Sequence, residues 1–100
     1  MVKVILRRHV KADNYKRIIG LLQDLRAAAL HQPGYISGET LVRGRDPVEV
    51  LAIGTWLSEQ HWRDWSSSRE RNELESMVEP LLEGNVEALV YQVPDDNLDW

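Results

Sequence analysis

Four segments of the chain are rich in apolar and β-branched residues and are bounded by turn residues, a pattern typical of β-strands. The first runs from Val2 to Val10 and the second from Tyr35 to Arg43. The turn-forming residues 44–47 then predict a hairpin that returns as a third strand from Val48 to Trp56. Residues 86–93 form the fourth predicted strand.

A helix is predicted between the first two strands, because apolar residues recur there at helical spacing. Asp13 is its expected N-cap, and the turn at Pro33 and Gly34 ends the segment. The apolar stripe of this helix consists of Tyr15, Ile18, Ile19, Leu22, Leu25 and Ala29.

A second helical region, in two pieces, is predicted between the third and fourth strands. Ser58 is expected to cap a short helix, and Ser67, with Glu70 in capping-box spacing, to open another. Pro80 lacks an amide hydrogen and should kink or restart this second helix before Gly84 caps its end. The short helix carries His61, Trp62 and Trp65, and the stripe of the longer one consists of Leu74, Met77, Val78 and Leu81.

The order of these elements is β-α-β-β-α-β, which predicts a ferredoxin-like α+β fold with a four-stranded antiparallel sheet and helices on one face. We expect residues 1–93 to form a single domain and residues 94–100 an acidic tail, in which Leu98 and Trp100 are candidates for docking on a neighbour. The third strand is nearly continuous in apolar residues after Glu49, whereas an antiparallel strand with one wet face should alternate. Both faces of the sheet should therefore be covered, which predicts a homodimer paired through the sheet.

The charge of the chain narrows its range of partners. Its formal net charge is −4, and its Lys and Arg residues are scattered apart from the short cluster of Arg7, Arg8 and His9. Phosphate binding requires a concentrated basic face, so neither nucleic acid nor an anionic membrane is an expected partner. The chain has no cysteine, which excludes disulfides and thiolate sites, and its N-terminal apolar run is too short for a signal peptide or membrane span. We therefore expect a cytoplasmic protein.

Three stretches of the chain resemble the antibiotic biosynthesis monooxygenase family of dimeric α+β barrels. They are Gln-Pro-Gly-Tyr-Ile-Ser-Gly-Glu-Thr at residues 32–40, Ala-Ile-Gly-Thr-Trp at residues 52–56 with the Trp-bearing helix after it, and Glu-Pro-Leu-Leu at residues 79–82. The resemblance covers nearly the whole chain and implies that two chains pair their sheets to close a barrel. Some members of the family oxidise polyketide-like aromatics without metal or flavin, and others bind and degrade haem.

The resemblance does not favour haem degradation. The haem-degrading branch uses an Asn on the first strand, a Trp on the helix after the third strand and a His later in the helical region. Trp65 matches that Trp, whereas the Asn position falls near Leu6 and the His position near Glu75. Two of the three residues therefore differ.

His61, Trp62 and Trp65 are the densest group of side chains suited to a site. His61 and Trp65 are one helical turn apart and share a face, with Trp62 beside them. Together with Trp56, this group predicts the wall of an apolar pocket for a flat aromatic ligand, in which His61 or Trp65 is the candidate catalytic residue and His61 would accept or donate a proton. The alternative interpretation is that the tryptophans anchor a short helix on the sheet and that His61 is exposed.

Arg26 is the second candidate for the pocket. At about 100° per residue it falls between Ile19 and Leu22 on the apolar stripe of the first helix. A buried guanidinium needs a carboxylate, a carbonyl or water, and Glu39 on the following strand is the candidate partner. Two other interpretations remain open: Arg26 extends to solvent near the end of the helix, or it contacts a substrate.

The sequence predicts neither a metal site nor a cofactor site. His9 and His31 do not stand in a metal-ligand spacing. The chain has no nucleophile elbow and no Gly-rich phosphate loop, so flavin, nicotinamide and nucleotide sites are not expected.

Two functions from different classes follow from these observations. The first is a cofactor-independent monooxygenase acting on a small aromatic or quinone-like molecule, in which the substrate supplies the electrons and the protein supplies a dry pocket and a proton acceptor. The second is a non-catalytic ligand-binding or interaction dimer, and haem binding is a minor third. The residues alone leave these alternatives open and name no substrate.

Overall fold

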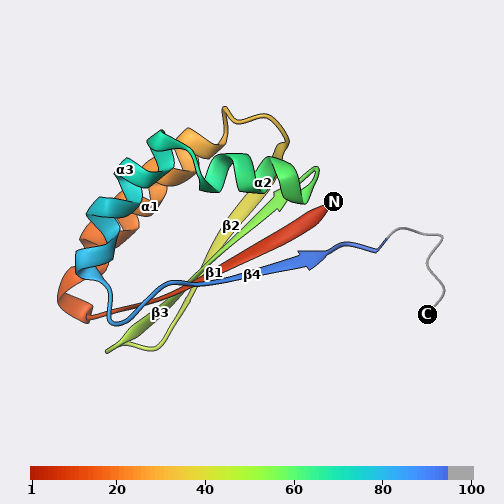
Figure 1. Cartoon of the computed structure of the whole chain (residues 1–100). Coiled ribbons are helices and arrows are strands. Elements are labelled where there is room, and N and C mark those ends of the chain that lie inside the picture. Colours follow the sequence, from red (N-terminus) through yellow and green to blue (C-terminus); the bar gives the residue numbers. More distant parts are fainter. Residues whose placement is uncertain (95–100) are drawn as a thin grey trace.

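The four strands form one antiparallel sheet in the order β2-β3-β1-β4 (Figure 1). In the computed structural model, which describes residues 1–94, three strands have the predicted bounds: β1 (Val2–Val10), β2 (Tyr35–Arg43) and β3 (Val48–Trp56). The last strand, β4 (Glu87–Gln92), is shorter than predicted by one residue at each end. The predicted contacts of the tail at Leu98 and Trp100 lie outside the described residues.

The helices all lie on one face of the sheet (Figure 1), which confirms the ferredoxin-like α+β fold. Pro80 follows the end of the third helix, where the chain tightens into a 3₁₀ turn because proline offers no amide hydrogen to continue the α-helical pattern. The helical elements are η1 (Ala12–Asn14), α1 (Tyr15–Ala29), α2 (Glu59–Ser66), α3 (Arg69–Val78) and η2 (Glu79–Leu81).

One predicted helix cap is confirmed, and three predicted caps are wrong. The Ser58 hydroxyl accepts a hydrogen bond from the amide of His61 and opens α2 as expected. The third helix begins one residue later than predicted, because Ser68 rather than Ser67 accepts the amide of Arg71. Asp13 lies inside the 3₁₀ turn before α1 and does not cap it. Gly84, at φ +81°, forms a turn beyond the end of η2 instead of capping a helix.

The core lies between the inner face of the sheet and the helices. Most of the predicted α1 stripe is inside: Ile18, Leu22, Leu25 and Ala29 are buried, and Tyr15 packs against them. Ile19, also predicted for the stripe, is only partly buried and is not part of this core. The strands contribute alternate residues to the same core. The buried apolar residues from the sheet are Val2, Val4, Val10, Val48, Val50 and Trp56.

The buried face of α3 differs from the predicted stripe. Met77 is half exposed, whereas Glu75 is buried beside Val78. Val78 is three residues after Glu75 and therefore lies on the same side of the helix, while Met77 is turned about 100° away from Val78. A carboxylate thus occupies a position that apolar patterning alone does not identify.

The other face of the sheet carries no helix in the described chain (Figure 1). Apolar side chains gather there because they alternate with the inward residues of each strand. We call this surface the outer face; its apolar residues are Ile5, Leu41, Leu51, Ile53, Leu89 and Tyr91. None of the helices within residues 1–94 is long and apolar enough to cross a membrane.

Candidate functional site

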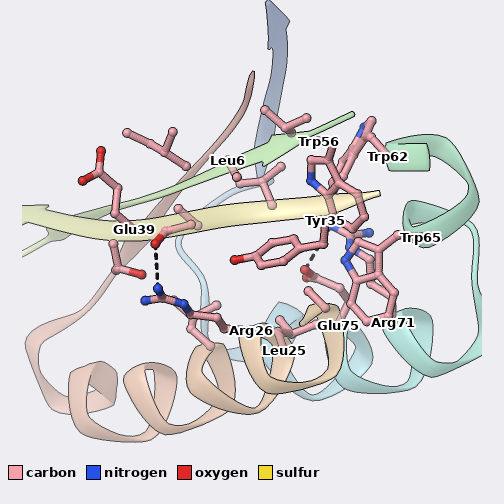
Figure 2. Close-up of a pocket in the computed structure, with 18 of the residues that line it drawn as sticks. Leu6, Leu25, Arg26, Tyr35, Glu39, Trp56, Trp62, Trp65, Arg71 and Glu75 are labelled. Carbon is pink, nitrogen blue, oxygen red and sulfur yellow. Dashed lines mark hydrogen bonds and ion pairs between the residues drawn. The ribbon is translucent and has the colours of Figure 1, made fainter. Parts of the chain in front are cut away.

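A pocket opens between the inner face of the sheet and the helices (Figure 2). The space between its lining atoms, including the part open to solvent, is about 600 Å³. Most of the lining is apolar, and it comes from every layer of the fold: Leu6 from β1, Leu25 from α1, Tyr35 from β2 and Ala52 from β3. This is the kind of concave apolar site that holds small molecules.

Aromatic side chains form one end of the pocket. Trp62 and Trp65 of α2 are both buried, and their side chains extend from the helix toward the sheet (Figure 2). Trp62 meets Trp56 edge to face at 6.0 Å between ring centroids, and Tyr35 meets Trp56 in the same way at 5.2 Å. The structure therefore brings together all three tryptophans that the sequence predicted for the pocket. They pack the helix on the sheet and line the pocket as well.

Tyr35 reaches across the pocket from its place at the start of β2 (Figure 2). Its hydroxyl lies directly against Gly38, where any Cβ would overlap it. Glycine at residue 38 thus lets the phenol lie flat along the strand. Tyr35 was not among the predicted site residues, and its signal in the sequence was the resemblance of residues 32–40.

Charged side chains lie at the same end as the tryptophans. Arg8, only 1% exposed, forms an ion pair with Glu75, and the Arg71 guanidinium lies 3.2 Å from the same carboxylate oxygen. Arg71 also lies over the Trp62 ring, 5.2 Å from its centroid. Burial lowers the pKa of Arg71; the charge of Glu75 opposes this change, and that of Arg8 adds to it.

Arg8 has a donor that nothing in residues 1–94 satisfies. Its Nη2 donates to Glu75, but its Nε is buried and has no hydrogen-bond partner among the described residues. A buried guanidinium N–H without an acceptor is unfavourable, because it loses its hydrogen bonds to water and gains none. Arg8, one of the residues that line the pocket, therefore carries a buried donor without an acceptor in the described chain.

Sequence analysis missed Arg8, Arg71 and Glu75. The signal for Arg8 was present, since Val2, Val4, Arg8 and Val10 share one face of β1 by simple alternation. Glu75 and Arg71 are one turn apart on α3, which is ion-pair spacing, but an i,i+4 pair is as common on exposed helix faces.

The structure does not bring His61 to the pocket lining. Its ring packs against the turn at Gly34, and its Nδ1 lies 2.6 Å from the Ser58 hydroxyl. Trp65, one turn later, does line the pocket. The shared helix face that the spacing predicts therefore does not carry both side chains into the same space, because His61 meets the chain at Gly34, just before the start of β2.

Arg26 and Glu39 lie at the opposite end of the pocket from the tryptophans (Figure 2). The expected pair between them is not formed: Arg26 Nη2 donates to the Gly38 carbonyl oxygen at 2.7 Å, and the Glu39 carboxylate is turned away from it (Figure 2). Arg26 is exposed rather than buried on the apolar stripe, because its long stem extends past the core to the edge strand. Of the three partners considered for this guanidinium (a carboxylate, a carbonyl or water), the structure shows a carbonyl.

The three positions compared with the haem-degrading branch do meet in space. Leu6, Trp65 and Glu75 all line this pocket. Here, however, an apolar side chain and an ion-paired carboxylate occupy two of them. Within residues 1–94, no group of three His, Asp or Glu side chains is placed to hold a metal ion.

The fold and pocket define a small ferredoxin-like α+β protein with an apolar pocket between sheet and helices. The model of the antibiotic biosynthesis monooxygenase family matches residues 1–73, so the chain belongs to that family. Arg8 and Arg71 fall within the matched residues and Glu75 just beyond them. A comparison with curated proteins found no match.

Solved structures with the same fold cover nearly the whole chain. A protein from Mycobacterium tuberculosis superposes with a TM-score of 0.82 at 18% identity, covering 97% of this chain and 98% of its own. SnoaB, a cofactor-independent oxygenase from Streptomyces nogalater, gives 0.79 at 13% identity and covers 98% and 97%. A conserved protein from Methanosarcina mazei gives 0.83 at 18%, covering 91% and 90%. At these identities the similarity establishes the fold.

Proposed function

We propose that this protein is a cofactor-independent monooxygenase that acts on a small aromatic or quinone-like molecule. The observation that carries the proposal is the pocket lined by Trp56, Trp62 and Trp65 in a chain of the antibiotic biosynthesis monooxygenase family. Three indole rings and Tyr35 offer flat apolar surfaces to an aromatic ligand. The likeness to a cofactor-independent oxygenase supports the same reaction class.

The reaction balances without a further reductant. A reduced aromatic substrate gives up two hydrogens and takes one oxygen atom from O₂, while the second oxygen atom leaves with those hydrogens as water. The substrate supplies all four electrons. The protein's part is to exclude water from the reacting carbon and to stabilise the substrate anion that forms when a proton is lost.

Oxygen uptake and product mass test this proposal. The chain, dialysed against a chelator, is mixed with a panel of reduced two- and three-ring phenols under ¹⁸O₂. We expect uptake above the uncatalysed rate and a product that carries one ¹⁸O atom. A full panel without uptake would overturn the proposal.

A non-catalytic ligand-binding function is the second candidate, and a specific observation favours it. His61, the expected proton acceptor, does not line the pocket, and the Glu75 carboxylate is engaged by two arginines. Saturable binding of aromatic molecules without any oxygen uptake would support this alternative. Conversion of added haem to a bilin-like product would support the third.

We further propose that the protein is a homodimer paired through the outer face. Proteins of this family are typically dimers. The central residues Ile5, Leu51 and Ile53 of this face are apolar and are not covered by any helix of the described chain. Apolar surface of this kind gains free energy when a second copy removes it from water.

A further inference from the structure

We propose that the tryptophan end of the pocket binds an ionised oxygen of the ligand through Arg8 and Arg71, so that the preferred ligands are aromatic carboxylates or ionised phenols and enols. The inference names a substrate class for the proposed function and rests on it only in taking this pocket as the ligand site.

The charges that line the pocket support an anionic ligand. Arg8, Arg26 and Arg71 contribute three positive charges, whereas Glu39 and Glu75 contribute two negative ones. The pocket is therefore positive by one charge in a chain whose formal net charge is −4. An excess charge of one sign in a site with apolar walls attracts and holds ions of the other sign.

This excess is concentrated at the buried end. Arg26 binds a carbonyl oxygen at the exposed edge, far from the tryptophans (Figure 2). At the tryptophan end, two guanidinium groups share the single carboxylate of Glu75. One positive charge there remains without a carboxylate among residues 1–94, and buried charges are stable only when they are paired.

Hydrogen bonding points to the same end. The Arg8 side chain is 1% exposed and ion-paired with Glu75, so it is held in place before any ligand arrives, and its Nε donor has no acceptor within residues 1–94. An anionic oxygen that displaces the side chains covering this nitrogen would supply the missing acceptor. A ligand that has its ring against Trp62 and Trp65 and its anionic oxygen toward Arg8 would use both features of this end.

A matched pair of probes tests the charge preference without any requirement for catalysis. The probes are 2-naphthoate and 2-naphthamide, which share ring system and shape and differ in charge. Their affinities are measured by calorimetry at neutral pH, with quenching of tryptophan fluorescence as a second readout. We expect naphthoate to bind about tenfold more tightly, since a charge-assisted hydrogen bond exceeds a neutral one by about 1.4 kcal/mol.

Two variants with the same change of charge locate the preference. Arg71→Gln removes a pocket charge and should bring the affinities of the two probes within about twofold of each other. Arg69→Gln removes a charge from the same helix at a side chain that is 92% exposed, and it should keep the tenfold preference. Arg71 is preferred to Arg8 for this test because replacing the fully buried Arg8 endangers the fold.

The outcomes separate this inference from the proposed function. Equal binding of both probes to the wild type would overturn the anionic preference and leave the aromatic pocket intact. A preference that survives in Arg71→Gln would overturn the assignment to this end of the pocket. Absence of binding by both probes at millimolar concentration would overturn the pocket as an aromatic site, and the proposed function with it.

Discussion

At the scale of single residues, the unusual feature of this chain is a pair of opposite charges inside the core. Arg8 shares the inner face of β1 with the apolar residues Leu6 and Val10 and is almost completely enclosed. A charge in such a position is stable only because Glu75 and its hydrogen bond replace the lost water. The Glu75 carboxylate therefore stabilises the fold through Arg8 and also lines the pocket.

We predict that Glu75→Ala destabilises the protein by about 3 kcal/mol, because it leaves the Arg8 charge buried with no carboxylate beside it. Glu73→Ala is the matched control on the same helix. Its pair with Arg69 is exposed, so its loss should cost under about 0.5 kcal/mol. Urea unfolding of the two variants measures the difference, and equal costs would show that the Arg8 charge is satisfied in another way.

A second residue-scale prediction concerns Glu49 on the outer face. Burial of this side chain opposes its ionisation, but hydrogen bonds from Arg43 and His9 and the charges of Arg43 and Arg7 outweigh that effect and lower its pKa. A carboxyl with a lowered folded-state pKa stabilises the fold above its ordinary pKa of 4.5 and loses that contribution as the pH falls through the folded value.

Glu49→Gln should therefore lose less stability than the wild type when the pH is lowered from 6 toward 3. Urea melts across this range give the slopes. Glu87→Gln, which replaces an exposed carboxylate on β4 of the same sheet, should keep the wild-type slope. If Glu49→Gln were as acid-sensitive as the wild type, the arginines and histidine around this carboxylate would carry no net stabilisation.

The residues of the site differ in how far the sequence predicts them. Trp62 and Trp65 can be predicted from the sequence, because large aromatic side chains at one-turn spacing indicate a packed helix face. Both line the pocket. Arg8 was overlooked as part of a basic cluster, although strand alternation places it inside. The direction of His61 depends on its contact with the turn at Gly34, which is distant in sequence and cannot be derived from helix periodicity.

At the scale of elements, strands were easier to predict than helix boundaries. A run of β-branched residues bounded by turn and cap residues gives both ends of a strand, as in β3, which follows Pro47 and ends shortly before Ser58. The start of α3 lies in a run of three serines, any of which has the side chain of an N-cap. The choice among them depends on where the preceding helix ends, since Ser67 donates its hydroxyl to the carbonyl oxygen of Arg63 in α2.

This difference gives a prediction for neighbouring serines. Ser68→Ala should cost about 1 kcal/mol, because the amide of Arg71 loses its acceptor at the start of α3. Ser67→Ala, at an exposed position, should cost under about 0.5 kcal/mol. Thermal melts of the two variants compare them directly, and the reverse order would place the cap at Ser67.

At the scale of the whole molecule, the sheet has one face covered by helices and one that is open (Figure 1). Apolar patterning on β3 predicts that both faces are buried, but the described chain covers only the first. A small domain has little apolar surface to bury by itself, so pairing through the outer face would add to a limited core. The size and shape of such an interface cannot be derived from one chain's sequence.

We predict a particle of about twice the chain mass of 11.6 kDa in light scattering at micromolar concentration. Ile53→Glu places a charge in the middle of the outer face and should yield monomers. Met77→Glu adds the same charge at an exposed position of α3 and should leave the mass unchanged. A wild-type monomer would contradict the proposed dimer.

The most direct test of the account is whether oxidation of an aromatic substrate takes place in the pocket. Ala52 lines it from β3, and Ala52→Leu fills part of the space; Ala88→Leu makes the same change at an exposed position of β4. The measurement is oxygen uptake with the best phenol of the panel. We predict that kcat/KM falls at least about tenfold in Ala52→Leu and stays within about twofold of the wild type in Ala88→Leu. Uptake that is unchanged in a folded Ala52→Leu variant would contradict the account.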